Sequence, residues 1–116
     1  MWPWKWNKID KEFTARFGQI ESINYGLCCV LKLNPAKQMK FMDFSKRNSN
    51  KDRSSLVAAG YTIQKASEQL KSCMELLEYA NNNAFVTPQD WDVINATRIC
   101  LEHVVCVLGG TIKKKK

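Results

Sequence analysis

The sequence predicts an all-α fold, in which a long N-terminal helix and an antiparallel helical hairpin form a three-helix bundle. Three observations predict it. Apolar residues recur at steps of three or four along three stretches, a proline-containing helix start opens the last stretch, and only about six residues join the second stretch to the third. The length of 116 residues suits one domain. Because the predicted helices are long and their apolar stripes narrow, we expect the bundle to be a homo-oligomer.

The first predicted helix spans residues 9–34 and follows a Trp-rich basic arm, residues 1–8. Its apolar residues fall on one helical face: Ile9, Phe13, Phe17, Ile20, Ile23, Leu27 and Val30. Pro35 stops the helix, because a residue that precedes proline is pushed out of the α region.

The predicted hairpin occupies residues 54–110. Its first helix is expected to have Ser54 or Ser55 as N-cap and to run unbroken to residues 81–83, which are three asparagines. The apolar stripe of this helix comprises Leu56, Ala59, Ile63, Ala66, Leu70, Cys73, Leu77 and Ala80.

The second helix of the hairpin has the strongest start signal in the chain. Thr87 suits the N-cap, Pro88 the first helical position, and Asp90 the first turn, where the helix dipole favours a negative charge. Gly109 and Gly110 are expected to end this helix.

Positive charge is concentrated outside the predicted helices. The chain has 18 Lys and Arg against 11 Asp and Glu, a net charge of +7. The basic segments are the arm, the linker at residues 35–53 and the lysine tail at residues 111–116. The first part of the linker has enough apolar surface to dock on the bundle or on a partner, through Met39, Phe41, Met42 and Phe44. We expect its second part to be polar and mobile. Reading of a DNA groove by the hairpin is disfavoured, because residues 54–112 have three Lys or Arg against six Asp or Glu.

The leading functional expectation is a non-enzymatic helical interaction or adaptor protein that self-associates and contacts a protein partner. Aromatic side chains in the arm and linker are the candidate partner-binding residues, since aromatic residues are favoured at interfaces: Trp2, Trp4, Trp6, Phe41 and Phe44. The candidate contacts to nucleic acid or another acidic partner are Lys37, Lys40, Lys46, Arg47, Lys51, Arg53, Lys113, Lys114, Lys115 and Lys116.

Two alternatives use the same segments. In the first, the protein binds nucleic acid without reading sequence, as its cations neutralise phosphates and Phe41 and Phe44 stack on exposed bases. In the second, it is a small inhibitor of the kind that phages or plasmids encode, and its arm occupies a pocket on a host protein complex. Contact of the arm and tail with an anionic membrane surface is the least favoured reading.

Neither enzymatic activity nor a cofactor or metal is expected. Cys100, His103 and Cys106 diverge by about 120 degrees around one helix, so they cannot all reach one tetrahedral ion. The chain has one His and scattered glycines, which disfavours both a Cys–His nucleophile and a Gly-rich phosphate loop. Five Cys, an odd number, favour small buried thiols and a cytoplasmic location. The longest apolar stretches fall short of the about 20 residues that span a bilayer.

Overall fold

All regular structure in the described part of the chain is helical. The computed structural model describes residues 3–33, 42–82 and 86–109, with side chains from residue 11 onward. The elements are α1 (Pro3–Leu31), a 3-10 helix η3 (Phe44–Lys46), α2 (Ser49–Ala58), α3 (Ile63–Asn81) and α4 (Pro88–Val107). The predicted all-α class is confirmed.

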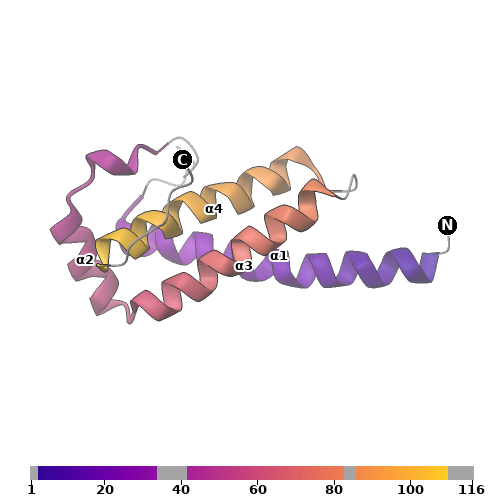
Figure 1. The fold of residues 1–116 in the computed structure, drawn as a ribbon, viewed down its shortest axis with the longest axis horizontal. Helices are drawn as coiled ribbons and strands as arrows, with labels where there is room; N and C mark the ends of the chain where they lie inside the picture. Colours follow the sequence, from indigo (N-terminus) through magenta and orange to yellow (C-terminus); the bar gives the residue numbers. More distant parts are fainter. Residues whose placement is uncertain (1–2, 34–41, 83–85, 110–116) are drawn as a thin grey trace.

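The described residues contain four α-helices, where the sequence predicted three. α3 and α4 lie side by side as a hairpin, α1 packs along it, and α2 covers one end (Figure 1). Each helix contributes fully buried side chains to one core, among them Leu27 of α1, Leu56 of α2, Leu76 of α3 and Leu101 of α4. None of the described helices is both long and apolar enough to cross a membrane.

Helix α1 starts earlier than predicted, because residues 3–8 belong to it rather than to a separate arm. Pro3 is compatible with this start, since a proline in the first helical turn lacks an N–H that would have no helical partner anyway. The helix ends at Leu31, where the N–H of Leu33 donates to the Cys28 carbonyl over 2.9 Å. Lys32 takes the left-handed conformation, φ 56°, that this type of helix end requires.

The N-terminal part of α1 extends past the end of α3 and the start of α4 (Figure 1). Phe13 contacts the last turn of α3. Its ring stacks on that of Tyr79, two residues before the end of α3, with ring centroids 5.8 Å apart. The ten helical residues before Phe13 span about 15 Å at 1.5 Å per residue.

The helix predicted to run unbroken from residue 54 is in fact two helices. Gly60, with φ +85°, separates α2 from α3, and Thr62 begins α3 as an N-cap whose hydroxyl accepts from the N–H of Lys65 over 3.0 Å. The regular apolar spacing across this break was misleading, since Ile63, predicted to face the core, is 43% exposed. Ala59 is exposed as well.

Helix α2 also starts earlier than predicted. Its N-cap is Asn48, whose side-chain oxygen accepts from the N–H of Lys51 over 3.1 Å, and not Ser54 or Ser55. Residues 45–53, the polar part of the linker that was expected to be mobile, therefore include the end of η3 and the first half of α2. Local capping accounts for this difference, because it needs no apolar periodicity.

The start of α4 agrees with the prediction. The Thr87 hydroxyl accepts from the N–H of Asp90 over 3.1 Å, and Pro88 occupies the first turn. The helix ends at Val107, and Gly109 follows with φ +97°. Glycine is favoured in this conformation because it has no Cβ.

Candidate functional site

A buried carboxylate ties α2 to η3 and α4. Asp52 of α2 is 3% exposed. It accepts two hydrogen bonds from Arg47, from Nε to Oδ2 over 2.8 Å and from Nη2 to Oδ1 over 2.9 Å. His103 of α4 places its Nε2 2.9 Å from Asp52 Oδ2, so this nitrogen carries the proton if the carboxylate accepts. These three residues, which we call the Asp52 cluster, join segments 51 residues apart.

The Asp52 cluster is held from two further sides. Nη2 of Arg47 also donates to the Leu31 carbonyl at the end of α1, over 2.7 Å. The ring of Phe44 lies against His103, with ring centroids 5.0 Å apart. The cluster therefore fixes η3 and α2 on α1 and α4.

Electrostatics in the cluster favour the ionised forms of Asp52 and Arg47. Burial is the largest effect on Asp52 and opposes ionisation, but the hydrogen bonds and charges of Arg47 and His103 together lower the pKa of its carboxyl below the ordinary value. The hydrogen bond to Asp52 is the main reason that the pKa of Arg47 is raised. The cluster thus contains a stable ion pair with little exposure to water.

A surface hollow of about 360 Å³ opens beside this ion pair. It lies between the end of α1, η3 and the start of α2, and four of the residues that line it are cationic: Lys32, Lys46, Arg47 and Lys51. Lys32, Lys46 and Lys51 are exposed. Asp43 is the exposed carboxylate nearest to Lys46 in the sequence, and its Oδ2 lies 3.9 Å from the Lys46 Nζ.

Arg53 adds a fifth cation at this end of the molecule. A Cβ built on Gly109 would lie 4.0 Å from Nη1 of Arg53, so the end of α4 lies beside this exposed arginine. We call these five cations the basic corner: Lys32, Lys46, Arg47, Lys51 and Arg53.

The structure brings together some of the predicted contact residues and buries one of them in the core. Lys46, Arg47, Lys51 and Arg53 share the basic corner. Phe44, expected to contact a partner or stack on bases, is 8% exposed and packs in the core, so that expectation is wrong.

The other predicted contact residues lie outside what the structure describes. Trp4 and Trp6 lie on the described backbone of α1, but their side chains are outside the described part. The remaining ones fall wholly outside the described residues: Trp2, Lys37, Lys40, Phe41, Lys113, Lys114, Lys115 and Lys116.

Sequence reasoning missed Asp52 and His103. Asp52 occurs in a segment read as polar linker, where one more charge gives no signal. His103 was noticed only as a lone histidine in an apolar helix. A histidine on a core-facing stripe needs a buried polar partner, and this was the available clue.

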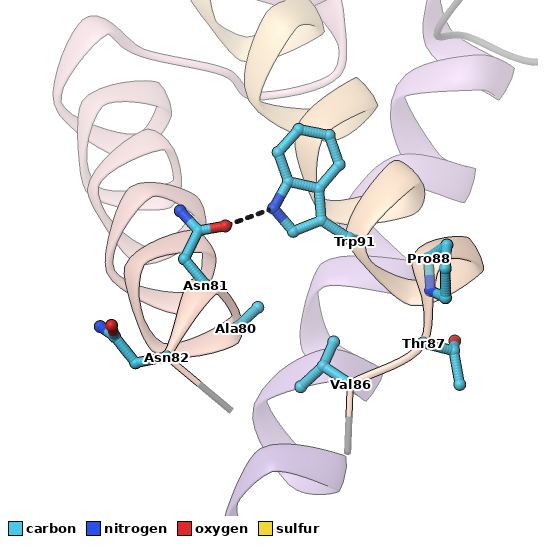
Figure 2. Close-up of a pocket in the computed structure, with 7 residues that line it drawn as sticks. All are labelled: Ala80, Asn81, Asn82, Val86, Thr87, Pro88 and Trp91. Carbon is cyan, nitrogen blue, oxygen red and sulfur yellow. Dashed lines mark hydrogen bonds between the residues drawn. The ribbon is translucent and has the colours of Figure 1, made fainter. Parts of the chain in front are cut away.

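A second pocket, of about 510 Å³, lies where α3 ends and α4 begins. Figure 2 shows the Trp91 ring over the end of α3, with its Nε1 donating to Asn81 Oδ1 over 2.9 Å. The side chains that line this pocket carry no titratable group. The pocket offers no group for acid–base or metal chemistry, and the Trp91 contact fastens the two helix ends together.

The five cysteines are free thiols, of which two are buried, two are exposed and Cys28 is intermediate. Burial raises the pKa of Cys73 to about 12, and it also raises that of Cys100, so neither is a thiolate near neutral pH. Cys29 and Cys106 are exposed, so the expectation of buried thiols is wrong for these two. Within the described ranges, no three His, Cys, Asp or Glu side chains are grouped so that they could hold a metal ion.

Comparison of the chain with protein-family models, curated proteins and solved structures finds no match. Function is therefore inferred from the residues themselves. In the described part, the arrangement best suited to a ligand is the basic corner, where cations from three elements surround a hollow.

Proposed function

We propose that this chain is a non-enzymatic helical interaction protein that contacts a nucleic-acid backbone through its basic corner, without reading base sequence. The separation of charge carries this proposal. At the basic corner, five Lys or Arg accompany two carboxylates, Asp43 and Asp52. Residues 63–109, in contrast, have three Lys or Arg and six Asp or Glu. A polyanion is attracted to one end of the molecule and repelled along α3 and α4.

The other basic segments join the described fold at the same end of the molecule as the basic corner, which supports the proposal. Lys37 and Lys40 lie in the sequence between Leu33 and Met42, which flank the end of α1 and the start of η3. The lysine tail follows Gly109, which lies beside Arg53. Two segments far apart in the sequence, residues 34–41 and 110–116, therefore join the described fold close to cations of the basic corner.

Lysine and arginine side chains neutralise phosphates and release counterions, which makes binding strongly dependent on salt. The four exposed cations are Lys32, Lys46, Lys51 and Arg53. If each neutralises one phosphate, the logarithm of the affinity falls against that of the salt concentration with a slope of about −3.6 for duplex DNA and about −2.8 for a single strand.

The test is a salt titration of fluorescence anisotropy with labelled single- and double-stranded DNA and RNA of unrelated sequences. The proposal predicts binding at low salt, slopes at least as steep as those above, and similar affinities for different base sequences. Absence of binding at low salt would contradict it, and a strong preference for one base sequence would show that phosphates alone do not explain the contact.

Self-association is a second proposal, and it rests on the N-terminal part of α1. This part extends past the ends of α3 and α4 (Figure 1), and most helical stability in proteins comes from the packing of an apolar face. A second copy that packs against this part would stabilise it. The proposal predicts a light-scattering mass of at least twice 13.4 kDa at micromolar concentration. It also predicts that the Trp4→Asp/Trp6→Asp variant is monomeric, whereas Tyr25→Asp, a change at a 71% exposed position further along α1, leaves the mass unchanged.

A further inference from the structure

The hollow at the basic corner differs from a scatter of surface lysines because it contains an arginine that is already fixed. Arg47 uses three of its five N–H groups on Asp52 and the Leu31 carbonyl. Among the described residues, no hydrogen bond is made by the two N–H groups on its Nη1. The guanidinium is held in one orientation, so a ligand that bonds to Nη1 does not have to immobilise a free side chain.

The side chains around Arg47 determine which ligand suits the hollow. Lys32, Lys46 and Lys51 line it from α1, η3 and α2. The charge of Arg47 is balanced by Asp52, and Asp43 lies near Lys46, but the lining as a whole stays positive. A phosphate group fits this lining because it has several acceptor oxygens and a full negative charge, and arginine and lysine are its usual partners.

We propose that the hollow is a phosphate-binding subsite, in which Nη1 of Arg47 donates to the phosphate oxygens and Lys32, Lys46 and Lys51 surround them. The phosphate is either a phosphodiester of a nucleic acid or a free phosphate group. The first source rests on the proposed function, while the second does not. Arg47 is then the residue that gives one phosphate a fixed position, whereas exposed lysines neutralise any phosphate nearby.

The test uses inorganic phosphate and the full-length protein. Phosphate is titrated at constant ionic strength against chloride while the NMR signals of the backbone amides of residues 46–51 and of the Arg47 Nε–H are followed. The proposal predicts saturable shifts of these signals. Arg47→Lys, which keeps the charge, is expected to weaken phosphate binding by about tenfold or more, since a hydrogen bond to a charged group is lost.

Two further variants keep the test valid if Arg47→Lys does not fold. Lys46→Gln/Lys51→Gln removes two exposed cations without touching the Asp52 cluster, and it is expected to weaken phosphate binding as well. Lys71→Gln is the matched control, because it removes an exposed cation of α3 that does not line the hollow, and it is expected to leave the shifts unchanged.

The same variants, measured with a labelled oligonucleotide, separate the two sources. If Arg47→Lys weakens both phosphate and oligonucleotide binding, the ligand is a phosphodiester. If it weakens phosphate binding alone, the hollow takes a free phosphate group, and the proposed function is wrong only if Lys46→Gln/Lys51→Gln also leaves oligonucleotide binding unchanged. If phosphate moves no signal of residues 46–51, or Arg47→Lys and the double variant bind phosphate like the wild type, the subsite is overturned even where the oligonucleotide still binds.

Discussion

Replacement of Asp52 by alanine is the perturbation whose cost follows most directly from the structure. The variant removes three hydrogen bonds to a buried carboxylate. It leaves the Arg47 side chain, 21% exposed, with the Leu31 carbonyl as its only partner shown here, and the His103 side chain, 10% exposed, without its carboxylate. Loss of one member of a buried ion pair costs about 3 to 5 kcal/mol.

Because Arg47 keeps some contact with water, we expect the lower end of that range, about 3 kcal/mol. A chain of this length has a total stability of about 6 to 17 kcal/mol, so the loss is large but leaves the protein folded. In urea the unfolding midpoint falls by about 1 to 3 M, given a slope of about 1 to 3 kcal/mol per M. The assay is urea unfolding followed by far-ultraviolet circular dichroism.

Asp43→Ala is the control, because Asp43 is an exposed carboxylate nine positions earlier, whose side chain accepts hydrogen bonds from Ser45 and lies 3.9 Å from the Lys46 Nζ, both at the surface. We expect it to lower the midpoint much less than Asp52→Ala. Equal midpoints for the two variants would refute the role assigned to the Asp52 cluster.

The pH dependence of the Asp52 contribution has a definite sign. The pKa of the Asp52 carboxyl is lower in the folded protein than its ordinary value of 3.8, so the folded state holds the ionised form more strongly. Its contribution is fully present above pH 3.8 and is lost as the pH falls through the folded pKa. The difference in stability between wild type and Asp52→Ala should therefore shrink in acid below pH 3.8. A difference that grows in acid would contradict this.

Two further predictions concern backbone strain and thiol access. Gly60→Ala should destabilise the protein by about 1 to 2 kcal/mol in urea unfolding, because Gly60 has φ +85°. Gly18→Ala should instead stabilise α1 by about 0.5 to 1 kcal/mol, since an added methyl meets nothing within 4 Å. Iodoacetamide at a pH of about 8 should label the exposed Cys29 and Cys106 and spare the buried Cys73 until urea is added, as read by mass spectrometry. Labelling of Cys73 in the native protein, or equal effects of the two alanine variants, would contradict these expectations.

The helix starts and ends that were predicted correctly have local causes. Thr87, Pro88 and Asp90 start α4 through contacts within one turn, so three residues within four positions suffice to locate its beginning. The break at Gly60 was missed although it is local as well, because the apolar steps across it imitate one continuous helix. Only the conformation of Gly60 and the Thr62 cap separate α2 from α3.

The candidate site was predicted in part. Lys46, Lys51 and Arg53 were chosen as contact residues from charge alone, and the fold leaves all three exposed. The pairing of Asp52 with His103 could not be predicted from the sequence, since it depends on how α2 packs on α4, and the two residues are 51 positions apart. For the same reason, Phe44 was assigned to a binding surface, although the fold buries it against His103.

The most direct test of the central claim compares two charge reversals of equal size. Lys46→Glu/Lys51→Glu alters the basic corner, and Lys65→Glu/Lys71→Glu alters exposed positions of α3. In a salt titration with labelled duplex DNA, the first variant should bind more weakly, with the salt slope reduced in magnitude by about 2. The second should keep the wild-type slope. Equal losses in both variants would show that net charge, and not the basic corner, accounts for binding.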